Sequence, residues 1–186
     1  MVDLLGGIDL EITDEEMEYI NGYCVENEQV TGVSYTPLYS SGYVHLDGIQ
    51  ALAYCRIRYT EGWDYKRTER QRTVLSLIYR KAREQGVTSL INIVNSMLPS
   101  ISTSMDAPEL ISLATALGSY QIGEQAGFPF EQYPANLPDA GDVVVPVNLA
   151  NNVTALHEFL YDEAAYEPSQ AVQEISQTII DRTGIA

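Results

Sequence analysis

The sequence predicts an α/β domain in which a mixed sheet is flanked by helices, and three observations support this fold class. Amphipathic helical segments alternate with short apolar strands along the 186 residues. Hydrophobic residues make up 45% of the chain, which excludes global disorder and suits a domain with its own core. The chain contains no repeat and no linker long enough to divide it. We therefore expect a single domain over residues 1–186.

The first third of the chain is predicted to combine one strand with two helices. In order, we expect a turn and a strand within 2–12, an acidic helix over 14–28, an irregular loop over 29–46, a short helix from Asp47 and an extended piece over 55–59. Asp14 and Asp47 are predicted N-caps, because a short acidic side chain can accept a hydrogen bond from an amide of the first turn.

The rest of the chain is predicted to be mostly helical. A helix over 65–85 follows Asp64 as its N-cap and ends at Gly86. Further on we expect helices over 88–98, 106–117, 148–161 and 168–183, strands near 120–126 and 143–147, and a Pro/Gly-rich loop over 127–141. These strands are few for a complete sheet, so the chain is predicted to be the C-terminal part of a larger domain.

The positive charges are concentrated in one stretch of the chain. The net charge is −16 at pH 7, which disfavours general binding of nucleic acid or anionic lipid. Nine of the ten Lys and Arg residues nevertheless lie between Arg56 and Arg83, which we call the arginine segment, against three acidic residues. An acidic chain that gathers its cations in this way is predicted to hold an anion there, or a partner that matches the pattern.

Arg67 is the most informative of these cations. In the long helix it lies on the face that continues through Gln71 to the apolar residues Val74 and Ile78, so it points inward. An unpaired guanidinium in that position would be costly to desolvate. Two interpretations remain open: Arg67 pairs with Asp64 or another carboxylate and ties the helix down, or it lines a pocket and meets a phosphate.

The neighbouring arginines favour a phosphate. Arg56 and Arg58 alternate, so in an extended segment both side chains point to one side. The turn that follows brings them back beside the start of the helix, where Arg67 and Arg70 lie. Arginine binds phosphate through paired hydrogen bonds, and helix N-termini favour anions. These arginines therefore predict an anion site, with the carboxylate of Asp64 as the alternative counter-charge.

A resemblance to the LytR–CpsA–Psr family is carried by residues 47–72, DGIQALAYCRIRYTEGWDYKRTERQR. Residues 2–8 are similar to the Gly-Gly strand of that family, and residues 166–179 are similar to its C-terminal helix. The resemblance implies an enzyme that takes a polyprenyl-pyrophosphate-linked glycopolymer and transfers the glycosyl phosphate to a peptidoglycan hydroxyl. It also implies a polymer such as wall teichoic acid or capsular polysaccharide. The implied location is the extracellular face of the bacterial cytoplasmic membrane, with the membrane anchor outside this chain.

The resemblance also assigns roles within the arginine segment. The positions that match residues holding the pyrophosphate are Arg56, Arg58, Arg67 and Gln71, and Arg70 completes the basic wall. Asp64 matches the carboxylate that orients these arginines, so Asp64 and Arg67 are the catalytic candidates. The lipid tail of the family's substrate needs an apolar tunnel. Residues 88–98 and 74–82 are candidates for its lining, with ordinary core as the alternative.

The family's magnesium-binding aspartates lie on strands that precede its Gly-Gly strand, and this chain has no equivalent of them. The resemblance therefore implies that this chain alone binds no magnesium, and it leaves enzymatic activity open. One alternative is a non-catalytic fragment that binds an anion or polyprenyl phosphate. A DNA-binding regulator is another, which the net charge and the inward direction of Arg67 disfavour. A sheet without its first strands would expose an edge, which favours a homo-oligomer.

The remaining candidates are predicted to have structural roles. Cys24 and Cys55 are expected to be free thiols, since nothing in their spacing favours a disulfide. His45 and His157 lack the spacing of metal ligands. The acidic helix over 14–28 lacks the pattern of a calcium loop and is predicted to present a solvated face.

Overall fold

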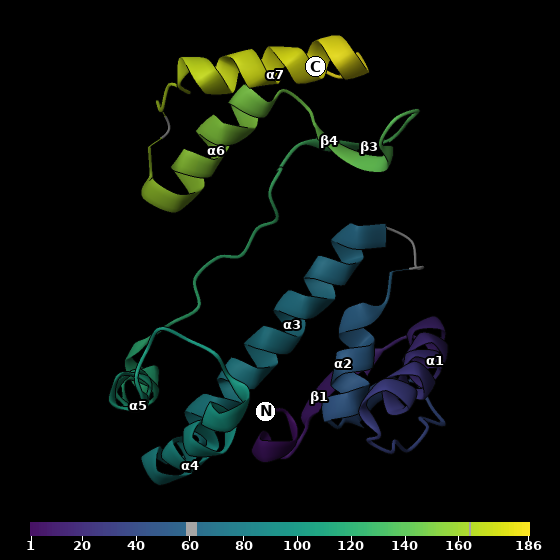
Figure 1. Cartoon of the computed structure of the whole chain (residues 1–186), viewed down its shortest axis with the longest axis vertical. Coiled ribbons are helices and arrows are strands. Elements are labelled where there is room, and N and C mark those ends of the chain that lie inside the picture. Colours follow the sequence, from purple (N-terminus) through teal and green to yellow (C-terminus); the bar gives the residue numbers. More distant parts are fainter. Residues whose placement is uncertain (59–62, 164) are drawn as a thin grey trace. The chain divides into compact units, whose positions relative to one another are not determined.

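The computed structural model describes residues 1–58, 63–163 and 165–186, apart from the side chains of residues 63–65. Helices and two small antiparallel sheets make up the fold, which confirms the predicted α/β class (Figure 1). The described strands pair only antiparallel, in two separate sheets, instead of in the predicted mixed sheet. The chain divides into two compact units, Met1–Gly123 (unit 1) and Glu124–Ala186 (unit 2). The single domain over the whole chain stays a prediction.

Unit 1 is mostly helical. Its elements are η1 (Asp3–Leu5), β1 (Ile8–Ile12), α1 (Asp14–Thr31), β2 (Gly42–Leu46), α2 (Gly48–Arg56), α3 (Trp63–Glu84), α4 (Val87–Met97), η2 (Leu98–Ser100), α5 (Ala107–Thr115) and η3 (Leu117–Ser119). The long helix predicted over 65–85 is α3, which begins two residues earlier, so Asp64 lies in its first turn instead of at the cap. None of the described helices is both long enough and apolar enough to cross a membrane.

The first sheet pairs β1 with β2 in antiparallel register, from Ile8 opposite Leu46 to Ile12 opposite Gly42. The irregular loop predicted over 29–46 is therefore wrong for its last five residues, and also for its first three, which belong to α1. Strand β1 buries every second side chain, but only Leu46 is buried in β2. The alternation that marks a strand in a sequence is consequently weak in β2, and its pairing with β1 is what makes it a strand.

One apolar core holds the first part of unit 1 together. It gathers side chains from β1, β2, α1, α2, α3 and the residues beside them, and among its largest fully buried members are Ile8, Ile20, Leu46 and Ile57. Helix α1 packs on α2, and α2 packs on α3. A second, smaller cluster joins Ala82 of α3 to Leu90 and Ile93 of α4. The two segments considered as tunnel lining, 74–82 and 88–98, therefore pack against each other at these residues. This arrangement is that of an ordinary core, the alternative given above.

Capping boxes determine where α1 and α2 begin. The N-cap of α1 is Thr13, whose hydroxyl accepts from the amide of Glu16, while the Glu16 carboxylate accepts from the amide of Thr13. The prediction of Asp14 as the cap is wrong by one residue, because only Thr13 has a glutamate at the third helical position to complete the box. The predicted cap Asp47 is confirmed, and Gln50 completes its box.

Unit 2 consists of a hairpin and two helices. These are β3 (Gln132–Leu137), β4 (Gly141–Pro146), α6 (Leu149–Tyr161) and α7 (Gln170–Thr183). Strand β4 and both helices confirm the prediction, but β3 lies inside the predicted loop over 127–141, and residues 120–126 form no strand. Pro134 argues against a strand in the sequence. A two-stranded sheet consists of edge strands, however, and edge strands tolerate proline.

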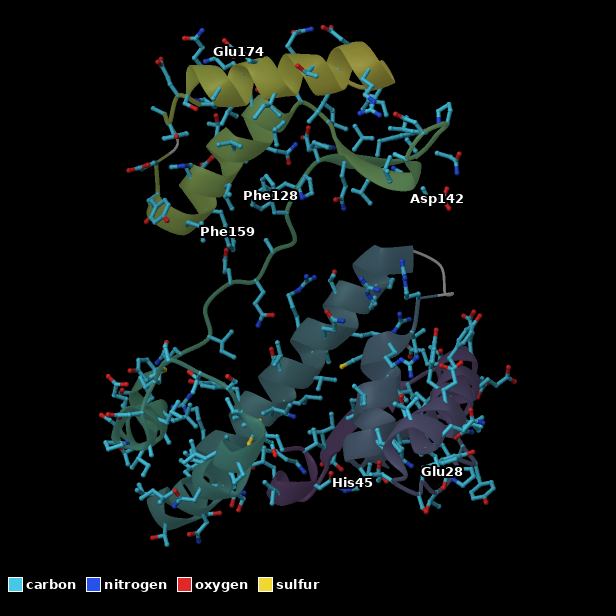
Figure 2. The ribbon with its side chains drawn as sticks, in the orientation of Figure 1. Glu28, His45, Phe128, Asp142, Phe159 and Glu174 are labelled. Carbon is cyan, nitrogen blue, oxygen red and sulfur yellow. The ribbon has the colours of Figure 1, made fainter. Side chains whose placement is uncertain are left out.

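A buried amide and an aromatic cluster tie the hairpin of unit 2 to α6. The side-chain oxygen of Asn152 accepts hydrogen bonds from the amides of Phe130 and Glu131, and its nitrogen donates to the carbonyl oxygen of Glu131. Asn152 is only 3% exposed. The ring of Phe130 meets the rings of Phe128 and Phe159 edge-on, both of which are labelled in Figure 2.

Two glycines allow the turn before β1 to approach the start of α2 closely. Gly7 has a φ of +81°, and a Cβ on it would overlap the imidazole of His45 and lie 2.9 Å from the carbonyl oxygen of Leu46. A Cβ on Gly48 would overlap the carboxylate of Asp3, which accepts a 2.7 Å hydrogen bond from the Gly48 amide. The turn before β1 therefore contacts the end of β2 at Gly7 and the start of α2 at Gly48, two positions where a side chain would not fit.

Replacing Gly7→Ala should lower the free energy of unfolding by at least about 2 kcal/mol, because the positive φ and the overlap both disfavour a side chain. The matched control is Gly22→Ala in the middle of α1, where a Cβ would meet nothing within 4 Å. That change should stabilise the protein by up to about 1 kcal/mol through helix propensity. Urea unfolding followed by circular dichroism measures both, and equal effects would refute the prediction.

Candidate functional site

The end of α2 and the first half of α3 lie side by side. The side-chain amide of Gln71 on α3 donates to the carbonyl oxygen of Cys55 on α2 at 3.4 Å. Arg70 Nη1 donates to the carbonyl oxygen of Ile57, just beyond α2, at the same distance. These contacts bring the two halves of the arginine segment together.

The two halves of the arginine segment come together through helix packing, and not through the extended piece that the sequence predicted. The extended piece expected over 55–59 is wrong for its first two residues, because α2 continues to Arg56. Ala51 and Tyr54 are buried one helical turn apart, and this packing against the core keeps the helix regular to its end. Arg56 and Arg58 consequently do not alternate along a strand. Their approach to α3 results from helix packing.

Arg70 is buried and serves as a tie between helices. It is 6% exposed, and its Nε donates to Glu16 Oε1 of α1 at 2.8 Å, with side-chain exposures of 7% and 13% for the pair. The guanidinium also lies 5.8 Å from the centre of the Tyr54 ring. The other carboxylate oxygen of Glu16 accepts from the amide of Thr13, so one acidic side chain both caps α1 and holds α3.

Arg56 is held by three side chains of α1. Its Nη1 donates to Asn27 Oδ1 at 2.5 Å and its Nη2 donates to Glu26 Oε2 at 2.8 Å. The guanidinium also lies over the ring of Tyr23, 4.7 Å from its centre. Although Arg56 belongs to α2, its position is thus determined by the helix that packs beside it.

The other predicted site residues differ in exposure. Arg58, which follows α2, is exposed, and Arg67 is half-buried. Val74 is buried as predicted, and the Gln71 side chain is directed to α2 although the residue is exposed. Gln71 lies level with the last turn of α2, to which its side chain is hydrogen-bonded. The side chain of Asp64 lies outside the described residues.

The acidic helix α1 contributes site residues that the sequence analysis missed. It was predicted to present a solvated face, but Glu16, Ile20, Tyr23 and Asn27 recur at the spacing of a single helical face. Ile20 and Asn27 on that face are buried. The helical spacing of these residues is visible in the sequence. It was missed because a search for regularly spaced apolar residues does not detect a face made of charged, aromatic and amide side chains.

Burial keeps the neighbouring weak acids protonated. It raises the pKa of Tyr54 to about 12, with the nearby Glu16 carboxylate as a further cause. It also raises the pKa of Cys24 to about 11 and raises that of Cys55. Both cysteines are free, as predicted. A thiol with a raised pKa is a poor nucleophile and a poor metal ligand at neutral pH, so neither cysteine is a candidate for the chemistry.

Neither histidine lies in a metal-binding group of the described residues. Nδ1 of His45 lies 2.7 Å from Asp9 Oδ1, and Nζ of Lys81 lies 3.0 Å from Asp9 Oδ2. These two hydrogen bonds lower the pKa of Asp9, so it stays ionised. His157 pairs with Glu163 at 3.0 Å in unit 2. Within the described part of the chain, no group of three or more His, Cys, Asp or Glu side chains could hold a metal ion.

Comparison with known proteins gives one family and one fold. The model of the LytR_cpsA_psr family matches residues 1–156. No curated protein matches the chain. Two similar solved structures are described as "TagT bound to LIIa-WTA" and "TagT bound to LI-WTA", each 19% identical with a TM-score of 0.53. A crystal structure of B. subtilis TagT matches with 18% identity and a TM-score of 0.47. Each match covers 99% of this chain and 56% of the other, so the chain spans little more than half the length of these structures.

Replacing Arg70→Met should lower the free energy of unfolding by about 3 kcal/mol, because it leaves the Glu16 carboxylate buried without its counter-charge. The control Arg72→Met removes the same charge from a partly exposed position of α3 and should change it by less than about 0.5 kcal/mol. Denaturant titration compares the two variants. Similar losses in both would mean that the buried ion pair does not tie α1 to α3.

Proposed function

Because the chain belongs to the LytR–CpsA–Psr family, we propose that it binds a polyprenyl-pyrophosphate-linked glycopolymer and takes part in attaching such polymers to the bacterial cell wall. The family match over residues 1–156 supports this proposal, and so does a fold similar to TagT structures whose titles name bound WTA (wall teichoic acid). The proposed location is the extracellular face of the cytoplasmic membrane. Wall teichoic acid and capsular polysaccharide are the polymer classes that we consider.

The observation that carries the proposal is the packing of the arginine segment on itself. Gln71 and Arg70 of α3 donate hydrogen bonds to the carbonyl oxygens of Cys55 and Ile57, so the backbone next to Arg56 and Arg58 lies beside α3, which carries Arg67. An anion bound between arginines of the two segments would be attracted by each of them. Arginine is well suited to phosphate because its planar group donates two parallel hydrogen bonds.

We divide the work among the predicted residues as follows. The direct contacts to the diphosphate come from Arg56, Arg58, Arg67 and Gln71. Arg70 is proposed to stabilise the arrangement of these residues, since its Nε donates to the buried Glu16 and its Nη1 to the carbonyl oxygen of Ile57. Asp64 stands in the first turn of α3, one turn before Arg67, and is proposed to orient that guanidinium.

The proposed reaction is a transfer of glycosyl phosphate. A peptidoglycan hydroxyl attacks the phosphorus next to the sugar, and the bond from that phosphorus to the bridging oxygen breaks. Polyprenyl phosphate leaves, and the hydroxyl proton passes to a base, for which Asp64 is the candidate. The arginines stabilise the negative charge that develops on the leaving phosphate, which is the main contribution a protein makes to phosphoryl transfer.

A second candidate function is binding without transfer. It is favoured by one observation: the described residues contain no cluster of acids that could hold magnesium. In this case the chain would hold polyprenyl phosphate or pyrophosphate, and the arginines alone would neutralise its charge. Association of two copies through the edge of the β1–β2 sheet is part of the same proposal.

Replacing Arg58→Ala should weaken the binding of pyrophosphate at least about tenfold, since each charge-assisted hydrogen bond contributes on the order of 1.5–3 kcal/mol. Arg80→Ala is the matched control, because it removes an exposed arginine farther along α3. It should change the affinity less than about threefold, as a loss of long-range attraction only. Isothermal calorimetry measures both affinities, and an unchanged affinity in Arg58→Ala would exclude this site.

Magnesium should change the affinity for pyrophosphate less than about threefold, once its complex with pyrophosphate in solution is taken into account. The reason is that the described residues offer the ion no ligand group. Calorimetry with and without magnesium tests this, beside an assay of glycosyl phosphate transfer on the same protein. Transfer that depends on magnesium would contradict binding without transfer and would support Asp64 as the catalytic carboxylate of the proposed reaction.

A further inference from the structure

The two polar partners of Arg56 differ sharply in burial. Glu26, which accepts from Nη2, has a side chain that is 58% exposed, and the Arg56 side chain is 40% exposed. Asn27, which accepts from Nη1, is a buried residue with 5% exposure. These neighbours on α1 therefore hold the same guanidinium in different ways: one from the solvent side and one from the core side.

Glu26 can be displaced at little cost. An exposed ion pair between long side chains contributes little net stability, because water and salt solvate the separated charges well. A phosphate group that approaches Arg56 carries more negative charge than a carboxylate and repels Glu26 at close range. Exchange of one anionic partner for another leaves Arg56 neutralised throughout.

Asn27 cannot be displaced in this way. Its side chain is packed between α1 and the end of α2, and its side-chain nitrogen has no hydrogen-bond partner among the described residues. A buried side chain is held by the groups packed around it, so the position of the Asn27 oxygen is fixed. That oxygen accepts from Arg56. Tyr23 covers the face of the guanidinium and restricts it further.

We propose that Glu26 is an internal counter-ion that occupies Arg56 until a phosphate displaces it, while Asn27 and Tyr23 keep the guanidinium in place in both states. The inference rests on the proposed function and assigns α1 a part in it. Glu26 competes with the phosphate and so lowers the apparent affinity. Asn27 is a positioning residue that raises the affinity, because it reduces the conformational freedom that Arg56 loses on binding.

Adjacent residues of one helix should therefore act in opposite directions. Glu26→Gln should strengthen pyrophosphate binding about two- to fivefold, which is the range expected for removal of a competing exposed carboxylate. Asn27→Ala should weaken binding about tenfold, the loss expected for one hydrogen bond to a charged group. A purely structural role of α1 would not produce opposite signs.

The test measures pyrophosphate binding by calorimetry at one ionic strength for the wild type and three variants. Glu28→Gln is the matched control for Glu26→Gln, because Glu28 lies on the same helix and its replacement changes the net charge equally (Figure 2). No contact between the Glu28 side chain and an arginine is present in the described part of the chain. Thermal unfolding of each variant identifies a change that only reflects loss of folded protein.

The expected result is a higher affinity for Glu26→Gln than for Glu28→Gln, together with a lower affinity for Asn27→Ala. Equal affinities of Glu26→Gln and Glu28→Gln in a wild type that binds would overturn the counter-ion inference and leave the proposed function standing. Glu26→Gln is a surface change that should fold, so this comparison holds even if Asn27→Ala does not fold. A wild type that binds no pyrophosphate would overturn the proposed function, and the inference with it.

Discussion

The buried ion pair between Glu16 and Arg70 is the contact on which the arrangement of unit 1 depends. It joins residues 54 positions apart in the sequence, and both side chains are largely removed from water. Each of them has a second partner: Glu16 caps α1, and Arg70 holds the carbonyl oxygen of Ile57. The pair therefore links three helices at one point, the start of α1, the first half of α3 and the end of α2. Loss of the Arg70 charge would leave the Glu16 carboxylate buried without its counter-charge.

This arrangement explains how a strongly acidic chain can keep its cations together. Helix α1 supplies a carboxylate to each of two arginines, in a buried pair at Arg70 and an exposed pair at Arg56. The buried pair has a fixed geometry because its charges have no access to water. The exposed pair can open, since water and salt compensate for its loss. In the proposed function, the same helix thus builds the support of the site and leaves its outer face open to exchange.

The directions of the two helices also favour the proposed anion. Arg56 is the last residue of α2, where the negative end of the helix dipole stabilises a cation. The start of α3 is the positive end of its own dipole, and Arg67 lies on its second turn. A phosphate held between the two would meet guanidinium groups from both helices and the favourable end of one of them. The short helix α2 keeps this direction because two carboxylates, from Asp47 and Asp3, accept from amides at its start.

The sequence by itself determined the features that depend on nearby residues. The helices, the cap at Asp47 and the concentration of cations follow from patterns within a few positions, since a capping box or a helical face spans only one or several turns. The motif of residues 47–72 likewise identified the family before any contact was known. Only the tertiary structure decided that β2 is a strand, that α2 extends to Arg56 and that Arg70 is buried against Glu16. Each of these results depends on a partner many residues away, and no local pattern records which distant side chain or strand will be packed beside it.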